Sequence, residues 1–600
     1  MTDPAYIIGI DLGTTNSIVA YTEADSESAA DIRIFRIPQL VDVGVVESRD
    51  ILPSFIYVPG RHEMADEALT LPWNSRNHLI VGEFARNRGA EVPNRLIASS
   101  KSWLCNTHVD RNKPILPWDA PADAERLSPI EASAMILSHI RDAWNYEMAD
   151  ADGQLRMENQ EILLTVPASF DAVARELTVQ AAESAGIPNI TLLEEPQAAF
   201  YSWIEAAGDQ WRKRVERGDL ILVCDIGGGT TDFSTIRISE ADGELILERI
   251  AVGEHLLVGG DNMDLALAYA IARKLAESGN KLDSWQIRGV VQSCRNAKEQ
   301  ILSDPNVTEY PVTVLGRGSS LIGGTMRASL VRDELESVIV EGFFPVCEAS
   351  AAPQRQQKVG LQEAGLSYES DPAVTRHMAK FISQHQAGPS PDARELPTAI
   401  LFNGGVMKPK AIRRRLMEVL NSWLPAASEA SIRTLDAESF DLAVARGAAY
   451  YGLARRGKGI RIRGGLNKTY YVGVAASMPA VPGMPAPVKA LCVAPFGKEE
   501  GTDLYISDQV FTLVVGEPVR FDFLGSAVRQ SDSAGSIIED WQGEIEEITT
   551  IETILDGEPG TAIQVTLEVK VTEIGTLELW CAAVSGDQRW KLEFNVREQK

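Results

Sequence analysis

The sequence lacks the features of a membrane protein and of a secreted, disulfide-bonded protein. No apolar run approaches the ~20 residues that a membrane-spanning helix needs, and the N-terminus MTDPAYIIG has no basic segment that would begin a signal peptide. The 6 cysteines are scattered without close pairs, which is typical of a reducing compartment and leaves no disulfide framework and no metal knuckle. We therefore expect a cytoplasmic protein without a membrane partner.

Positive charge is also scarce. The formal net charge is −27, and residues 467–600 alone carry 10 basic and 21 acidic side chains. A nucleic acid would be repelled, so we expect no nucleic-acid partner. Two nucleotide-binding signatures are missing as well. There is no GxxxxGK[ST] loop, which excludes a P-loop, and no GxGxxG turn that leads into a helix, which argues against a dinucleotide fold.

What the sequence does contain is one phosphate-binding pattern that occurs twice. YIIGIDLGTTNS (residues 6–17) and LILVCDIGGGTTDFS (residues 220–234) each have an apolar strand-like run, an aspartate, a glycine turn, hydroxyl side chains and a second strand-like run. Asp11 and Asp225 occupy matching positions, 214 residues apart. Glycine turns expose backbone N–H groups that can bind phosphate. The repeat predicts two half-sites that face each other across a cleft, around a nucleoside triphosphate and its metal ion.

The candidate ligands follow from these two loops. Mg²⁺ prefers oxygen ligands and keeps several waters, so a few carboxylates suffice, and the candidates are Asp11, Asp225 and Asp232. Hydroxyl groups that can add hydrogen-bond donors are those of Thr14, Thr15 and Thr230. A single DxGxxx segment is more simply explained as a hairpin turn, but two copies in matching strand contexts argue against that explanation.

The chain pattern predicts two domains, since 600 residues exceed the usual size of a single core. Residues 1–454 alternate strand-like and helix-like segments, an α/β pattern. The stretch 455–466 is basic and Gly-rich, which is typical of a linker, and residues 467–600 contain β-rich runs that predict a β-sandwich. Within the first domain we expect lobe I at about 1–212 plus 437–454, and lobe II at about 213–436.

The order of the motifs resembles the DnaK-type heat-shock-70 chaperones, within the superfamily of actin-like (ribonuclease H-like) ATPases. IGIDLGTTNS and VCDIGGGTTDFS are similar to the family's two phosphate motifs, and LLTVPASFDAVARELTVQAAESAGI followed by LLEEPQAAFYSW is similar to its connecting segment. VGGDNMD, LFNGGV and FDLAVARGAAYYG follow in the family's order. The resemblance covers nearly the whole chain. It implies a two-lobed α/β ATPase domain followed by a β-sandwich that binds extended polypeptide.

The resemblance also implies roles for individual residues. Glu195 of the EEP motif would orient or deprotonate the attacking water, with Asp225 as a second catalytic carboxylate, and Pro167 and Arg175 would form a relay between the domains. The residues implied to contact the nucleotide are Gly13, Thr14, Thr15, Asn16, Gly227, Gly228, Gly229, Thr230, Gly259, Gly260, Lys298, Gly404, Gly405 and Asp441. The implied cofactors are ATP or ADP and Mg²⁺, with K⁺ as a further candidate. The implied partners are unfolded polypeptide, a J-domain co-chaperone and a nucleotide exchange factor.

The chain departs from the family pattern at four places. Arg86 in VGEFARNR stands where the family has its catalytic lysine, and we expect it beside the γ-phosphate, with hydrolysis slowed because a planar guanidinium replaces a compact ammonium. Glu299 stands where the family stacks an arginine on adenine. The linker is basic instead of apolar. The sequence stops after the predicted sandwich, before the family's helical lid, which implies weak and fast-releasing peptide capture.

Three functions fit these observations. The leading hypothesis is an ATP-binding, DnaK-like chaperone and weak ATPase that couples nucleotide state to the binding of unfolded polypeptide. The alternative is a nucleotide-dependent binding module for a dedicated protein partner, with little or no ATP hydrolysis, and it is motivated by Arg86, Glu299 and the altered linker. The phosphate loops alone also permit a small-molecule kinase, which the added β domain and the LLEEPQAAFYSW context disfavour.

Overall fold

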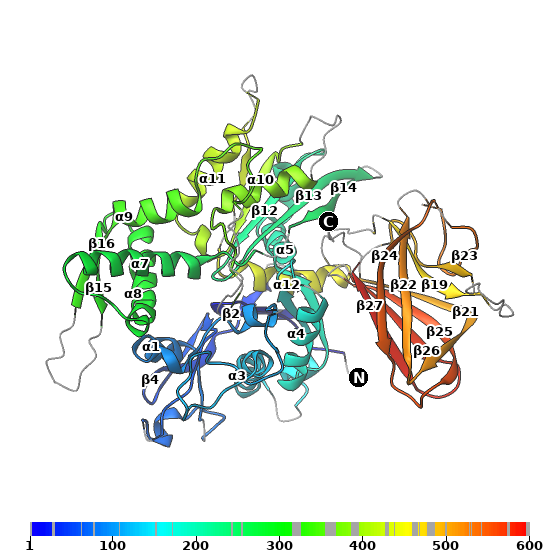
Figure 1. Ribbon diagram of the computed structural model, residues 1–600, viewed down its shortest axis with the longest axis horizontal. Helices are drawn as coiled ribbons and strands as arrows, with labels where there is room; N and C mark the ends of the chain where they lie inside the picture. The colour runs from blue at the N-terminus through cyan, green and yellow to red at the C-terminus, as the bar shows by residue number, and fades with distance from the viewer. Residues whose placement is uncertain are drawn as a thin grey trace. The chain divides into compact units, whose positions relative to one another are not determined.

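A computed structural model shows the chain as two compact units, residues 1–461 and 462–600 (Figure 1). It describes residues 3–26, 31–61, 63–75, 78–106, 108–149, 153–170, 172–241, 244–253, 256–314, 326–354, 366, 368–385, 395–425, 431–436, 439–458, 466, 468–476, 487–498, 501–526, 529, 531–541, 543–572 and 576–595. Most of the predicted linker, residues 459–465, lies outside the described residues. No helix among the described residues is long and apolar enough to cross a membrane. All 6 cysteines are described, and none forms a disulfide.

Lobe I, as we name the first part of unit 1, is built on a sheet whose strand order is β11-β10-β1-β2-β3. β1 (Tyr6–Leu12) and β2 (Asn16–Glu23) form an antiparallel hairpin, and β10 (Glu161–Val166) and β11 (Ile190–Glu194) extend the sheet in parallel. The other strands are β3 (Arg33–Ile34), β4 (Ile37–Asp42), β5 (Val45–Arg49), β6 (Leu52–Pro53), β7 (Ile56–Tyr57), β8 (Ile80–Val81) and β9 (Leu96–Ile97). The main helices are α1 (Glu83–Glu91), α2 (Ser100–Leu104), α3 (Pro129–Met148), α4 (Ala172–Ser184) and α5 (Glu195–Ala207), followed by the short α6 (Trp211–Arg214).

Lobe II repeats this topology with the strand order β14-β13-β12-β17-β18. β12 (Leu220–Ile226) and β13 (Thr231–Ala241) form the hairpin, and β17 (Ala399–Asn403) and β18 (Arg433–Leu435) extend it in parallel. The other elements are β14 (Glu244–Val252), β15 (Glu309–Val314), β16 (Met326–Val331), α7 (Gly260–Glu277), α8 (Ser284–Ser303), α9 (Arg332–Glu336), α10 (Val374–His385) and α11 (Lys410–Ser422). All seven residues of β12 are buried, as expected for a strand at the centre of a covered sheet.

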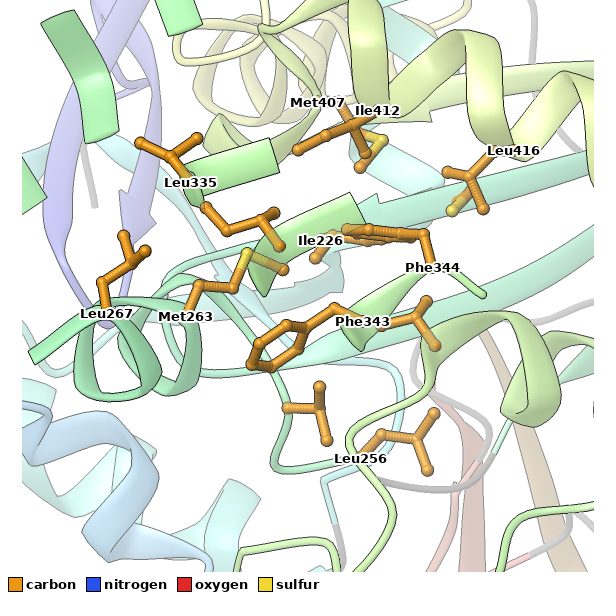
Figure 2. Packing of buried hydrophobic residues seen from close by; sticks show 14 of the residues in the cluster. Ile226, Leu256, Met263, Leu267, Leu335, Phe343, Phe344, Met407, Ile412 and Leu416 are labelled. Carbon is orange, nitrogen blue, oxygen red and sulfur yellow. The ribbon is translucent and has the colours of Figure 1, made fainter. Parts of the chain in front are cut away.

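The core of lobe II lies between its sheet and the helices that cover it. Figure 2 shows Ile226 of β12 among side chains from α7 and α11 and from the segment around Phe344, all buried in one cluster. Because Ile226 is the last residue of β12, this packing holds the strand end that precedes the glycine turn.

The chain returns to lobe I through α12 (Ala443–Arg455), which packs against α5 and β1 (Figure 1). A glycine allows the close crossing of the two helices, because a Cβ atom on Gly447 would lie 2.6 Å from the carbonyl carbon of Ala198 and 2.9 Å from the amide nitrogen of Ser202. The first turn of α5, which begins at Glu195, is therefore fixed by α12 from behind.

Unit 2 contains two antiparallel sheets in its described residues. Their strand orders are β23-β20-β19-β22-β24 and β21-β25-β26-β27, and residues of both sheets share one apolar core. The strands are β19 (Thr469–Ala475), β20 (Val488–Ala494), β21 (Thr502–Val515), β22 (Pro518–Ser526), β23 (Ile537–Ile538), β24 (Glu546–Ile554), β25 (Thr561–Val571), β26 (Thr576–Ala583) and β27 (Arg589–Asn595). Five runs are β-rich in sequence, residues 510–515, 519–523, 563–571, 576–584 and 590–596. They coincide with parts of β21, β22, β25, β26 and β27 to within one residue at the strand ends.

Candidate functional site

The two hairpins meet at a cavity of about 880 Å³ between lobe I and lobe II. This volume is within the range of sites that bind nucleotide-sized ligands. Its lining includes fifteen of the residues that the sequence pointed to, namely Asp11, Gly13, Thr14, Thr15, Asn16, Glu195, Asp225, Gly227, Gly228, Thr230, Gly260, Lys298, Gly404, Gly405 and Asp441. Glu299 lines the cavity as well.

The turns of the two hairpins have the same hydrogen bond. The Gly13 N–H donates to the carbonyl of Asn16 at 3.0 Å, and the Gly227 N–H donates to the carbonyl of Thr230 at 2.9 Å. In each case the aspartate is the second-last residue of the first strand of the hairpin, two residues before the glycine of the turn. The sequence repeat is thus a repeat of one backbone geometry, with one copy in each lobe.

The two turns also approach each other closely. A Cβ atom on Gly228 would lie 3.1 Å from the Cβ of Thr15 and nearer still to its hydroxyl, and one on Gly229 would lie 2.7 Å from the Cγ2 of Thr14. Only glycine fits at these positions while the lobes remain in this arrangement. Gly404 has a φ of +85°, a conformation that other residues rarely adopt, and it packs against the end of β12.

Asp11 and Asp225 face the cavity from equivalent sheet positions. The Thr165 hydroxyl donates to Asp11 Oδ1 at 3.3 Å, and the Asn403 amide donates to Asp225 Oδ2 at 2.8 Å. Burial, followed by repulsion from Glu195, raises the pKa of Asp11 to about 7 and raises that of Asp225 well above its ordinary value. Burial is the larger cause of both shifts and repulsion from Glu195 adds to it, so a bound cation would stabilise the charged forms of these carboxylates.

Asp232, the third predicted metal ligand, lies deeper and is not among the residues that line the cavity in the described structure. The Ser169 hydroxyl of lobe I donates to Asp232 Oδ1 of lobe II at 2.6 Å. Burial raises the pKa of Asp232, whereas the Ser169 hydrogen bond and the charge of Lys101 lower it. Gly229 and Gly259 likewise lie behind the lining residues, with Gly259 packed against the backbone of Gly228.

Lys101 is a charged residue of the cavity that the sequence reasoning missed. It belongs to α2, its side chain is 5% exposed, and its ammonium group forms an ion pair with Glu195 inside the cavity. Burial lowers the pKa of Lys101, but Glu195 and Asp11 raise it by more, so the net direction is upward. The available signal was a lysine among serines in the segment IASSKSWL, whose outer residues are apolar.

Arg86, which the sequence predicts beside the γ-phosphate, lies outside the lining of the cavity. It is half-buried on α1, its Nε donates to Asn87 Oδ1 at 3.4 Å, and it is not among the cavity-lining residues in the described structure. Burial lowers the pKa of Arg86, and the charges that act on it are those of Glu83, Glu299 and Arg295. Glu299 and Arg295 belong to α8 of lobe II and line the cavity, so Arg86 lies near the cavity residues of α8, and its place beside the γ-phosphate stays a prediction.

Charged pairs also border the cavity away from the hairpins. The Lys298 ammonium lies 2.7 Å from Asp264 Oδ1, and Arg295 pairs with both Asp261 and Asp264. The residue predicted on the returning helix, Asp441, precedes α12 and pairs with Lys408 at 2.6 Å. Lys298 and Asp441 thus stand at the cavity with their charges already compensated.

The two relay residues lie behind Glu195 and not in the cavity lining. Pro167 directly follows β10, and Arg175 donates to the carbonyl of Ala168 at 3.3 Å. Arg175 also lies 3.8 Å from Glu194, which precedes Glu195 in the chain. The same carboxylate, 1% exposed, pairs at 3.1 Å with Arg249 of β14. Glu194 therefore connects lobe I to lobe II.

A model of one protein family, described as Hsp70 protein, matches residues 7–349 of the chain. The match covers more than half of the sequence and includes both phosphate hairpins and the EEP motif. The chain belongs to the Hsp70 family. Membership implies the two-lobed, actin-like α/β fold for the nucleotide-binding part, and nucleotide binding with Mg²⁺.

The curated relatives of this Hsp70-family chain include several chaperones. It is 31% identical over 297 residues to the chaperone protein HscA of Enterobacter sp. (strain 638), covering 48% of this chain and 41% of that protein. It is 31% identical over 375 residues to HscA of Serratia proteamaculans (strain 568), covering 60% and 50%. It is 30% identical over 279 residues to the HscA homolog of Histophilus somni (strain 129Pt), covering 44% and 38%. The chain thus matches half or less of the length of these relatives.

The donor set of the cavity fits Mg²⁺ bound together with a nucleotide. Among the described residues, no group of three or more His, Cys, Asp or Glu side chains is arranged to hold a metal by itself. Mg²⁺ usually binds to one or two carboxylates, to waters and to substrate phosphates, so such a cage is not required. Asp11 and Asp225, which line the cavity from the two lobes, are the residues suited to this role.

Proposed function

We propose that the chain binds ATP with Mg²⁺ between its two lobes, hydrolyses it slowly, and couples the nucleotide state to the binding of extended polypeptide by unit 2. The observation that carries the first part is the pair of hairpins with matching hydrogen bonds, which lie on both sides of one cavity with Asp11 and Asp225 behind them. Polyphosphate is the ligand that two opposed sets of backbone N–H groups recognise.

Each group of the site has a distinct task in this proposal. The turns at Gly13 and Gly227 bind phosphate oxygens through backbone N–H groups, and the hydroxyls of Thr14 and Thr15 add further donors. Glu195 orients the attacking water and accepts its proton. When bound, Mg²⁺ would be held from the side of Asp11 and Asp225 and would neutralise phosphate charge. A role for K⁺ stays a prediction.

Nucleotide titration by isothermal calorimetry tests this function. We expect the purified chain to bind ATP and ADP in the presence of Mg²⁺, and Asp225→Asn to weaken this binding. Asp110→Asn is the matched control, because Asp110 is exposed and pairs only locally with Lys113. A wild-type chain without measurable nucleotide affinity would overturn the proposal.

Coupling to unit 2 is supported by the described start of the linker. Arg456 pairs with Glu161 at 2.7 Å, and Arg455 donates to Thr191 at 2.8 Å. Glu161 begins β10 and Thr191 lies near the start of β11, and these two strands lead at their other ends to Pro167 and Glu195. The start of the linker thus contacts the beginnings of two strands whose other ends lead to Pro167 and to the cavity residue Glu195, a route by which lobe closure would reach the linker.

Two observations support the proposal that unit 2 binds polypeptide. Unit 2 has two sheets around one apolar core, and the chain is similar to HscA chaperones. Exposed apolar side chains, such as those of Tyr505, Val510 and Ile554, are present on this unit. A J-domain co-chaperone, a nucleotide exchange factor and a cytoplasmic location stay predictions.

Binding of several unrelated unfolded proteins, with and without ATP, tests the chaperone function. We expect ATP to change their release rates, and Arg456→Gln to reduce this effect. Arg36→Gln removes an exposed arginine from a surface pair with Asp50 and serves as control. Nucleotide binding without affinity for any unfolded protein would favour the alternative, a module for one dedicated partner.

A further inference from the structure

The helix α2 (Ser100–Leu104) begins with three polar residues, and all five of its residues are buried. Ser100, Lys101 and Ser102 are each at most 4% exposed. The residue before them, Ser99, has a φ of +56°, which places a non-glycine residue in the left-handed region at a cost of about 1–2 kcal/mol. Polar burial and local strain together are unfavourable for folding, so this segment is explained better by a role at the site than by core packing.

Contacts from α2 reach both lobes. The Ser99 hydroxyl donates to Asp261 Oδ2 of lobe II at 3.2 Å. A Cβ atom on Gly229, in the lobe II turn, would lie 2.9 Å from the Ser102 hydroxyl oxygen. Between these two contacts, Lys101 pairs with Glu195. The negative charges of Asp11 and Asp232 also raise the pKa of Lys101. The ammonium group is thus placed where both hairpins, the EEP carboxylate and the cavity meet.

We propose that Lys101 is the cation that contacts the terminal phosphate of the nucleotide, and that it makes the site discriminate triphosphate from diphosphate. The inference rests on the proposed nucleotide-binding function. Without nucleotide, the positive charge of Lys101 is compensated by Glu195. A terminal phosphate supplies a second anion next to the ammonium, and Lys101 then shares its hydrogen bonds between phosphate and carboxylate.

This exchange frees Glu195 to act on water. In the hydrolysis step, the water oxygen forms a bond to the terminal phosphorus, and the bond from that phosphorus to the bridging oxygen breaks. The electron pair of that bond stays on the departing diphosphate, and the proton of the water passes to Glu195. Lys101 compensates charge on the terminal phosphate throughout. Arg86 lies outside the cavity lining on α1, where the charges that act on it are those of Glu83, Glu299 and Arg295.

Calorimetric affinities for ATP and ADP, each measured with Mg²⁺ and with EDTA, test the inference. We expect Lys101→Met to weaken ATP binding by about tenfold or more while ADP affinity changes by less than about threefold, because one charge-assisted contact is lost only with ATP. Arg86→Met is the matched control, and we expect it to leave the ratio of the two affinities unchanged. Lys101→Arg should restore part of the ratio.

A second variant keeps the inference testable if Lys101→Met does not fold. Glu195→Gln removes the competing carboxylate, so Lys101 becomes fully available and the preference for ATP over ADP should increase. A preference for ATP that survives in Lys101→Met, or one that falls in Glu195→Gln, would overturn the role of Lys101 and leave nucleotide binding intact. A wild-type chain that binds no nucleotide would instead overturn the proposed function and this inference with it.

Discussion

Gly447→Ala is the substitution for which the structure gives the sharpest expectation. Gly447 lies inside α12, where alanine is the better helix former by about 1 kcal/mol. Its new methyl group, however, would lie 2.6 Å from the carbonyl carbon of Ala198 and closer still to its oxygen. These are backbone atoms of α5 and cannot rotate away. The two helices must therefore separate by roughly an ångström, and overpacking of this kind costs about 1–3 kcal/mol.

The same shift affects the site, because α5 begins at Glu195, three residues before Ala198. A displacement of about 1 Å at a catalytic group can lower the rate by about a hundredfold. We therefore expect Gly447→Ala to unfold at lower urea concentration than the wild-type chain and to lose most of its ATP turnover. Fluorescence of tryptophans, including the buried Trp203 of α5, reports the unfolding.

Gly342→Ala provides the matched control. Gly342 has helical angles of φ −80° and ψ −44°, and a Cβ atom there would have no neighbour within 4 Å in the described structure. We expect this variant to be neutral or to gain about 0.4–1 kcal/mol. If Gly447→Ala unfolded at the same urea concentration as the wild-type chain, or if Gly342→Ala were the less stable of the two, the reasoning would be refuted.

Three further predictions concern the lobe contact, pH and the metal. Glu194→Ala and Arg249→Ala should each cost about 3–5 kcal/mol in urea unfolding, because each removes one partner of a buried ion pair, and the double variant should cost less than the sum; additive costs would contradict a direct pair. Burial lowers the pKa of His139 to about 4, below its ordinary value of 6.5, so the unfolded chain binds the proton more readily between these values. Stability should therefore fall by at most about 3 kcal/mol as pH drops from 6.5 to 4, and His139→Gln, measured alongside, should lose that part of the pH dependence; identical pH profiles would count against this assignment. Saturating ATP should stabilise unit 1 by about 2.7 kcal/mol at a hundred times its Kd, and the stabilisation at the same ATP concentration should shrink in EDTA; equal stabilisation with and without Mg²⁺ would argue against a metal at the site.

The sequence by itself determined the parts of the molecule that depend on local chemistry. The hairpin turn at Gly13 and its copy at Gly227 were readable because aspartate, glycine and hydroxyl residues form such turns wherever they occur between strand-like runs. The buried strand β12 was readable from its unbroken apolar run. The order of these motifs along the chain was enough to indicate the Hsp70 family, which the family match to residues 7–349 shows.

Only the tertiary structure decided which charges meet. Lys101 and Glu195 are 94 residues apart, and nothing in the local pattern links them. Arg86 follows a motif that resembles the family's, yet its direction is set by how α1 packs, and that packing turns it toward α8. Glu194 and Arg249 likewise pair across the two lobes. The physical reason is that turns and periodicity are fixed by neighbours in sequence, whereas the partner of a buried charge is fixed by long-range packing, where an uncompensated ion would cost several kcal/mol.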